Sequence, residues 1–190
     1  MLRIAIICAA AALAPLALAP VSAQTGYQTN GEAFVDAVRK DDGGKAIQLL
    51  REHPTVINAR NPKGDTALVI ALGRGDREWT GYLLNAGADV NLAGKDGDVP
   101  IIVAARLGFD EAIGWLTKLG AKVDSSNKLG ETALIIAVQA RNARAVRALL
   151  EAGADPDKSD YAGYSARDYA KRDNRSRQMS ELIEAKKPSK

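Results

Sequence analysis

The sequence has very few of the side chains that form covalent cross-links and most metal sites. It contains one cysteine, Cys8, and one histidine, His53, in 190 residues. A single cysteine excludes an internal disulfide framework, a cysteine-rich zinc finger and a CxxC redox motif. A single histidine excludes a metal site with several histidine ligands. No GxxxxGK[ST] phosphate loop is present, and no GxGxxG turn follows a strand pattern. We therefore expect no cofactor, no metal and no catalytic residues.

A strong excess of charge of one sign is also missing. The chain has 26 Lys and Arg against 23 Asp and Glu, a formal net charge of +3. This excess is too small to indicate a nucleic-acid-binding protein. Hydrophobic residues make up 46% and charged residues 26% of the sequence, which is ordinary for a folded globular protein. The length suits one domain with a real core.

A long apolar run occurs at the N-terminus. Arg3 is followed by an uncharged stretch over residues 4–19, and small residues stand at Val21 and Ala23. This order predicts a secretory signal peptide over residues 1–23, cut between Ala23 and Gln24. We expect a bacterial periplasmic protein, with secretion beyond the periplasm as a second possibility. An uncleaved segment would instead anchor the protein in the inner membrane, because it is just long enough to span.

The rest of the chain is an internal repeat, shown by two series of glycines in the same register. Members of each series are 33 residues apart, and the second series lies 23 residues after the first. The flanks match as well, with GDTAL at 64–68 and GETAL at 130–134, and with LLNAGADVN at 83–91 and LLEAGADPD at 149–157. The first series is Gly64, Gly97, Gly130 and Gly163, and the second is Gly87, Gly120 and Gly153.

This period and these flanks resemble the ankyrin repeat, whose hallmark is T-P-L-H-x-A-A followed by V-x-x-L-L-x-x-G-A. The resemblance covers about residues 33–185. It implies an all-α solenoid of about five helix–turn–helix repeats with connecting β-hairpin loops. The repeats would span about 31–60, 61–93, 94–126, 127–159 and 160–185, after a short lead at 24–32 and before a polar tail at 186–190.

Local chemistry supports these repeats independently. Thr66, Thr132 and Ser165 stand where a hydroxyl would cap a helix N-terminus, and Pro100 stands at the first helical position. The second glycine series provides left-handed helix ends. Three residues before the first series, Asn61, Asn127 and Asp160 favour a tight turn. The first repeat is offset by one residue, so the match of Gly31 to Gly64 is regarded as accidental.

The sequence departs from the family pattern at its histidine, which is replaced by Val69, Ile102 and Ile135. Aliphatic packing must take the place of the hydrogen bonds that this histidine makes between repeats of the family. Trp79 and Trp115, in the second helices, are expected to pack between repeats. His53 is expected to be structural or exposed, and the acidic run at 155–160 is expected to be a hairpin, because a calcium loop would require a glycine at its sixth position.

The resemblance implies a non-enzymatic module that binds another protein, and we expect the module to be a monomer. In the family, contacts are made by hairpin tips and by exposed positions of the first helix of each repeat. Tyr161 and Tyr164 are of particular interest, since tyrosine provides contact area at low entropic cost. The positions carried over are Lys63, Asp65, Arg74, Lys95, Asp96, Asp98, Arg106, Leu107, Lys128, Leu129, Glu131, Gln139, Tyr161, Tyr164 and Arg172.

Overall fold

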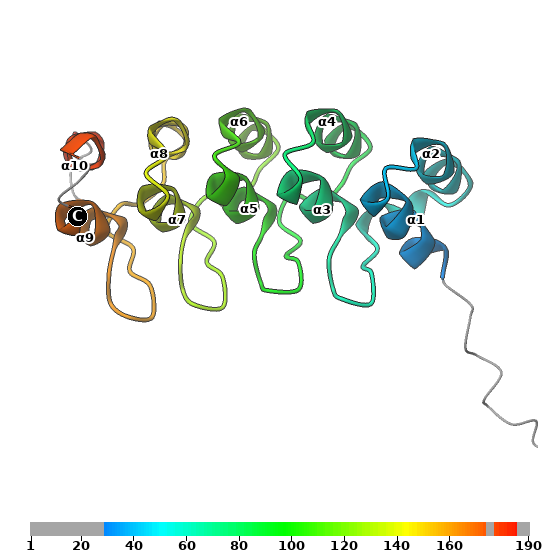
Figure 1. Ribbon diagram of the computed structural model, residues 1–190, viewed down its shortest axis with the longest axis horizontal. Coiled ribbons are helices and arrows are strands. Elements are labelled where there is room, and N and C mark those ends of the chain that lie inside the picture. The colour runs from blue at the N-terminus through cyan, green and yellow to red at the C-terminus, as the bar shows by residue number, and fades with distance from the viewer. Residues whose placement is uncertain (1–28, 174–176, 186–190) are drawn as a thin grey trace, which may run out of the picture.

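The computed structural model describes residues 29–173 and 177–185. The expected signal peptide, its cleavage site, most of the lead and the polar tail lie outside these residues. The described part forms an elongated stack of helix pairs in two layers, with hairpin loops projecting from one side (Figure 1). The inner helices, next to the hairpins, are α1 (Asn30–Arg39), α3 (Ala67–Gly73), α5 (Pro100–Leu107), α7 (Ala133–Gln139) and α9 (Ala166–Arg172).

The outer helices run along the side of the stack opposite to the hairpins (Figure 1). They are α2 (Gly43–Glu52), α4 (Arg77–Asn85), α6 (Asp110–Lys118), α8 (Ala143–Glu151) and α10 (Arg177–Glu184), and a 3₁₀-helix, η2 (Pro54–Asn58), follows α2. Each inner helix packs on the next inner helix along the stack. The described residues form ten α-helices in five stacked pairs, which confirms the predicted all-α solenoid.

Helix ends follow the sequence signals. The hydroxyl groups of Thr66, Thr132 and Ser165 each accept a hydrogen bond from the backbone N–H three residues later. Helix α5 has no such side chain and begins instead with Pro100. The glycines of the second series have φ angles of 87°, 87° and 94°, in the left-handed region, at the ends of α4, α6 and α8. The predicted caps are confirmed.

The core is a continuous apolar layer between the two rows of helices. Ala71, Ala104, Ala137 and Ala170, which are 33 residues apart, are all buried and let inner helices approach closely. At the positions where the family has histidine, Ile102 and Ile135 are fully buried and Val69 is half-buried. Aliphatic packing therefore replaces the polar contact, as the sequence analysis expected.

A ladder of Asn and Asp side chains joins neighbouring repeats. The side-chain oxygens of Asn58, Asn91 and Asp124 accept hydrogen bonds of 2.8–2.9 Å from backbone N–H groups 31 residues later. The fourth member, Asp157, instead pairs with the Arg167 side chain of the fifth repeat at 2.7 Å. These four residues are also 33 apart, a series that the sequence analysis did not identify.

The hairpins are held by single antiparallel bridges, Arg60 with Thr66, Ser126 with Thr132 and Ser159 with Ser165. The described residues contain no longer β-strand. In the same part of the chain, no helix has the length and the apolar character that crossing a membrane requires.

Candidate functional site

The hairpin face consists of the exposed residues of hairpin loops 59–66, 91–99, 124–132 and 157–165 and of the inner helices beside them. Three of the loops are fixed by one Asn or Asp each. The Asn61 side-chain oxygen accepts hydrogen bonds from the N–H groups of Lys63 and Asp65 at 2.9 and 3.0 Å. Asn127 and Asp160 make the same pair of bonds in their loops. The tips are thus held in shape before any partner arrives.

Neighbouring hairpins touch one another through the first glycine series. A Cβ atom at Gly64 would lie 3.3 Å from the Cα of Lys95, and one at Gly130 would lie 2.7 Å from Tyr161. Hydrogen bonds also join the loops, from Lys95 N–H to Asp65 and from Tyr161 N–H to the Leu129 carbonyl at 3.1 Å. The four loops therefore form one continuous surface along the stack.

Most predicted contact residues are exposed on this face. The most exposed apolar side chains are Tyr161 at 80%, Leu129 at 65% and Leu107 at 52%. Asp65 and Glu131 are half-buried. The charged and polar members that are exposed are Lys63, Lys95, Asp96, Arg106, Lys128, Gln139 and Arg172. The structure thus brings these predicted residues together along one side of the molecule.

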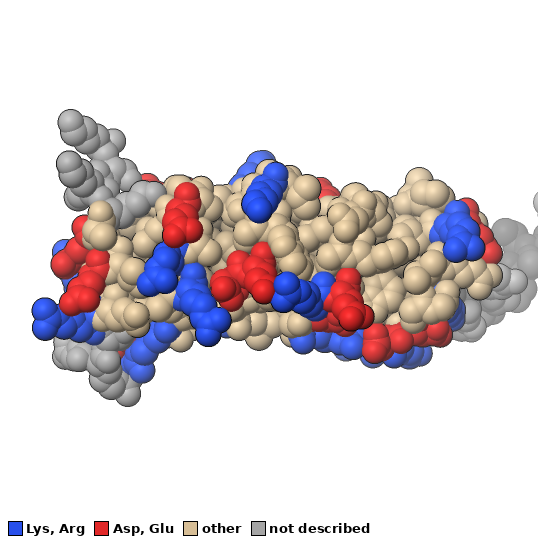
Figure 2. Space-filling view, turned by 90° about the horizontal axis from the view of Figure 1, so that it is seen from above, with Lys and Arg blue, Asp and Glu red and all other residues tan. Residues whose placement is uncertain are grey.

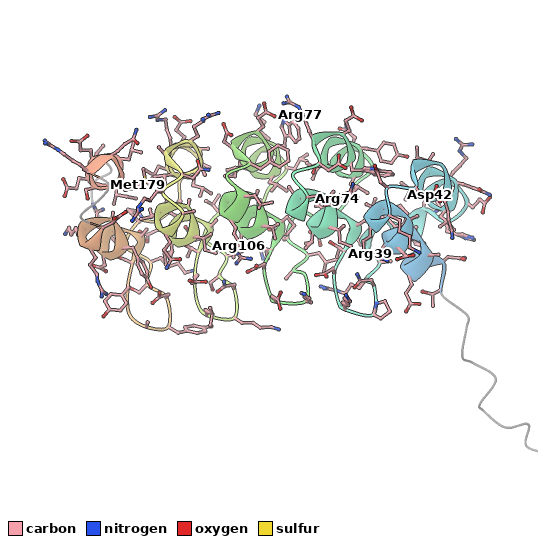
Figure 3. All side chains as sticks on the ribbon, viewed as in Figure 1. Arg39, Asp42, Arg74, Arg77, Arg106 and Met179 are labelled. Atoms are coloured by element: carbon pink, nitrogen blue, oxygen red, sulfur yellow. The ribbon has the colours of Figure 1, made fainter. Side chains whose placement is uncertain are left out.

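Asp98 is buried, which corrects the expectation that every residue carried over from the family pattern is exposed. It retains only 6% of its accessible surface, and its carboxylate is paired with Arg106. Asp98 stands two residues before α5, and Arg106 lies near the end of that helix on the hairpin side (Figure 3). The guanidinium therefore covers the carboxylate, and Arg106 is the partner of this pair that solvent can reach.

Arg74 also differs from the expectation, because its side chain contacts the first repeat and not a hairpin loop. Its guanidinium donates to the carbonyls of Val38 at 3.0 Å and Arg39 at 3.4 Å and lies 3.8 Å from Asp41 and Asp76. It stands beside Arg39 where α3 meets α1 (Figure 3). The residue therefore joins the first two repeats, although its side chain is partly exposed.

The two tyrosines of the fifth repeat differ in their surroundings. Tyr161 contacts the backbone of Gly130 and leaves most of its ring in solvent. Tyr164 is 39% exposed, packs on Tyr169 with 5.8 Å between ring centroids, and carries the Arg172 guanidinium 4.4 Å above its ring. Tyr161 is thus the more accessible of the two, and Tyr164 also stabilises its own repeat.

The Asp160 side chain holds hairpin loop 157–165 in shape through hydrogen bonds. Its carboxylate accepts the Tyr169 hydroxyl at 2.7 Å and the loop N–H groups. Partial desolvation acts to raise the pKa of Asp160, but the hydrogen bonds from Tyr164, Tyr169 and Ala162 outweigh it and leave that pKa below its usual value. The same contact, together with burial, raises the pKa of Tyr169. At neutral pH the Asp160 carboxylate is therefore ionised and the Tyr169 hydroxyl is neutral, as the hydrogen bond between them requires.

Shallow grooves lie between successive hairpins. One has a volume of about 290 Å³ and is lined by Asp96, Arg106, Lys128, Leu129 and Glu131, among others. Its lining residues include positively and negatively charged side chains and one exposed apolar side chain, that of Leu129. In the part of the chain that the structure describes, no group of three His, Cys, Asp or Glu side chains is arranged to hold a metal ion. The arrangement suits recognition of a polypeptide.

Motifs that suggested other chemistry are accounted for by the repeat. His53 is exposed and ends α2. In the acidic run, Asp160 organises the hairpin turn and Asp157 pairs with Arg167. Trp79 and Trp115 lie between repeats as predicted, since Trp79 donates to Asp41 of the first repeat at 3.1 Å and Trp115 lies under Arg77 of the second.

The sequence analysis missed two mid-helix glycines on the outer side, Gly81 in α4 and Gly114 in α6. They are 33 residues apart, so the repeat alignment contained the signal. A Cβ atom at either position would meet no other atom within 4 Å. Packing in the described structure therefore does not require glycine at these positions.

Comparison with known families agrees with this geometry. A family model described as "Ankyrin repeats (3 copies)" matches residues 34–127, 82–160 and 102–187. These overlapping matches together cover most of the chain. No match was found among curated proteins.

Proposed function

Because the chain belongs to the ankyrin repeat family, we propose that it is a non-enzymatic scaffold whose hairpin face binds another protein in the bacterial periplasm. Ankyrin repeat domains are in general protein–protein interaction scaffolds and are typically non-catalytic. The observation that carries the proposal for this chain is the exposed apolar pair Leu129 and Tyr161 on neighbouring, mutually bonded hairpins.

Leu129 and Tyr161 are anchors because they are exposed and yet rigidly placed. The hydrogen bond from Tyr161 N–H to the Leu129 carbonyl fixes the spacing of the two loops, and the Tyr161 ring rests on Gly130. Such side chains lose little conformational entropy when a partner covers them. Tyrosine is also among the residues that are enriched at interface hot spots.

The surroundings of these anchors indicate the chemistry of the partner. Lys128 and Arg172 provide positive charge, Asp96 and Glu131 provide negative charge, and none of these side chains is fully buried. A rim of mixed charge around an apolar centre suits a polar protein surface with one apolar protrusion. We therefore place the centre of the interface on the fourth and fifth repeats and propose that the scaffold acts as a monomer.

Replacing Tyr161 and Leu129 together tests the proposal. The double variant Tyr161→Ala with Leu129→Ser should weaken partner capture by about 1–4 kcal/mol, the range for hot-spot side chains. The measurement is quantitative crosslinking of the purified protein to its partner from periplasmic extract. Stability should change little, because both side chains are mostly in solvent.

Arg147→Ala is the control, because Arg147 is exposed on α8, in the outer layer of the fourth repeat. It should leave capture by the hairpin face unchanged. Unchanged capture by the double variant would contradict the proposal. A large loss of stability in that variant would show instead that the two side chains belong to the core.

Export depends on residues 1–23, and we propose that cleavage between Ala23 and Gln24 releases the protein. The apolar run and the small residues Val21 and Ala23 support this proposal. Intact-mass measurement of the protein from the periplasmic fraction should give a chain that begins at Gln24. A chain that begins at Met1 in the membrane fraction would favour the alternative, the same scaffold anchored by an uncleaved segment.

A further inference from the structure

The outer layer of the stack is not evenly packed. Helix α8 packs closely on both α6 and α10, whereas α4 makes few close contacts with either α2 or α6. Two grooves result, one on each side of α4. Figure 2 looks onto this side and shows mostly uncharged atoms over α2 and α4, with charged side chains along one edge.

The first groove, between α2 and α4, combines aromatic rings with carboxylates. It has a volume of about 420 Å³ and is lined by Ile47, Trp79 and Tyr82 and by the acidic residues Asp41, Asp76 and Glu78. Trp79 and Tyr82 stand edge to face with centroids 5.5 Å apart. Such a groove favours a cationic side chain, which gains from the ring faces and the carboxylates together.

The negative charge of this groove is only partly compensated. Arg74 lies 3.8 Å from both Asp41 and Asp76, and Asp76 also caps α4. Glu78 is exposed and makes no ion pair with any described residue. Three carboxylates against one guanidinium leave the groove with a net negative charge.

The second groove, between α4 and α6, is apolar. It has a volume of about 320 Å³ and is lined by Gly81, Leu84 and Asn85 from α4 and by Trp115, Lys118 and Leu119 from α6 and its end. Leu119 is 54% exposed. At one end, Arg77 pairs with Glu111 and covers the Trp115 ring on the outer side of the stack (Figure 3). An apolar side chain would fit between Trp115 and Leu119.

Gly81 lies on the side of α4 that faces the second groove, and it leaves that wall of the groove without a side chain. Glycine inside a helix is unfavourable relative to alanine, and nothing within 4 Å would obstruct a Cβ atom here. Its benefit is therefore not internal packing. Without a side chain at Gly81, a polypeptide backbone can approach the helix closely where it enters the second groove.

The distance between the grooves selects the conformation of such a segment. Packed helix axes are about 8–10 Å apart, and α4 is not closely packed on α2 or α6, so the two grooves are separated by about 10 Å. In a polyproline II helix, residues three apart face the same side and lie about 9 Å from each other. Aromatic-lined grooves are the usual receptors for this conformation.

We propose that the outer face around α4 binds an extended, proline-rich segment of a partner protein, with a basic side chain in the acidic groove and an apolar side chain three residues away in the second groove. This site is separate from the hairpin face, so either can fail without the other. The occupant is identified by charge complementarity with Asp41, Asp76 and Glu78 and by the open wall of the second groove at Gly81.

The test uses a synthetic proline-rich peptide with one arginine and, three residues later, one leucine. The chain has two tryptophans, Trp79 and Trp115, and each lines one groove, so intrinsic fluorescence reports on these grooves. The peptide should change the fluorescence saturably. A peptide with glutamate in place of arginine should not, and Glu78→Gln should weaken binding of the arginine peptide.

Gly81→Ala gives the sharpest result, because it should raise the urea midpoint of unfolding and yet weaken the peptide about tenfold, as an extra methyl group at a contact does. Gly114→Ala is the matched control. It occupies the same helical position one repeat later and lines neither groove, so it should raise the midpoint without changing affinity. The absence of saturable binding, equal binding of the glutamate peptide, or equal effects of the two alanine variants on affinity would each overturn the proposal.

Discussion

The fourth and fifth repeats have helices of the same kind, but they bury very different side chains. Helix α7 buries six of its seven residues, all apolar, whereas the equivalent helix α9 buries Ala166 and Ala170 alone. Between them, the Asn and Asp ladder changes partner. Asp124 accepts a hydrogen bond from the backbone N–H of Asp155 in the fourth repeat, whereas Asp157 of the fourth repeat pairs with the Arg167 side chain of the fifth.

This difference shows how a stack can end without exposing its core. An interior repeat is covered on both sides and can be apolar throughout. The fifth repeat instead uses polar side chains, with Arg167 paired to Asp157 and the Tyr169 hydroxyl donating to Asp160. The stability of the interior repeats therefore depends on apolar packing, and that of the fifth repeat depends on hydrogen bonds and ion pairs. Each contribution can be tested by comparing substitutions at equivalent positions.

The largest effect is expected at Leu149, compared with Leu182 at the same position of the last repeat. Leu149 is fully buried in α8, which packs between α6 and α10, whereas Leu182 is half-buried in α10. Leu149→Ala should lower the free energy of unfolding by about 3–4 kcal/mol, and Leu182→Ala by about 1 kcal/mol. Urea melts measure both. Equal losses would mean that the fifth repeat is packed like an interior one.

The next largest effect is a difference in stability between the alanine variants of Gly75 and Gly108, two glycines that join the helices of interior repeats. Both have left-handed φ angles, 66° and 69°, but a Cβ at Gly108 would lie 1.6 Å from the Asn142 side-chain nitrogen. Because Asn142 caps α8, Gly108→Ala should cost about 2–3 kcal/mol, against about 1 kcal/mol for Gly75→Ala. Thermal melts of the two variants check this order, and a larger loss for Gly75→Ala would contradict it.

A smaller effect is expected from the ion pair that closes the ladder. Arg167 is 13% exposed and donates to Asp157 and to the Ile183 carbonyl, and the contact with Asp157 raises the pKa of Arg167. Arg167→Met should lower the free energy of unfolding by about 1.5 kcal/mol. Arg177→Met is the control in the same repeat, because its pair with Glu181 is exposed and should contribute about 0.3 kcal/mol. Equal effects in urea melts would show that Arg167 does not stabilise the end of the stack.

The smallest effect is a difference in response to acid between the ends and the middle. Hydrogen bonds from Lys40 and Arg39 lower the pKa of Asp36 in α1, and the Ser165 hydroxyl and N–H lower the pKa of Asp168 in α9. A carboxylate with a lowered folded-state pKa stabilises the fold above its unfolded value and loses that contribution as the pH falls through its folded pKa. We therefore expect α1 and α9 to lose amide protection below about pH 4 before α5 and α7 do. Hydrogen exchange at a series of pH values measures this, and simultaneous loss along the stack would be contrary to it.

Much of the fold could be predicted because the repeat makes each position visible several times. The 33-residue period located the caps at Thr66, Thr132 and Ser165 and the left-handed helix ends. Positions at which one repeat departs from the common pattern were harder to predict. Asp41 and Arg141 occupy the left-handed joint where Gly75 and Gly108 stand, and the residue type of Arg141 does not indicate this, whereas aspartate is one of the residues that tolerate it.

The candidate site was predicted less completely, because exposure depends on side-chain pairing. The family pattern placed Asp98 at an exposed position, yet its pairing with Arg106 covers it. The pattern also directs attention to the hairpins and away from the outer helices. The grooves beside α4 depend on the spacing of α2, α4 and α6, which follows from the packing of whole helices.

Site-specific photo-crosslinking tests most directly the claim that the hairpin face of the last two repeats binds a partner protein. A crosslinking amino acid would be placed at position 129, 161 or 119, where the side chains are 65%, 80% and 54% exposed, in cells that produce the protein. Position 119 lies at the end of outer helix α6 and samples the opposite layer. The account predicts that positions 129 and 161 give adducts with the same partner. An adduct from position 119 with none from 129 or 161 would contradict it.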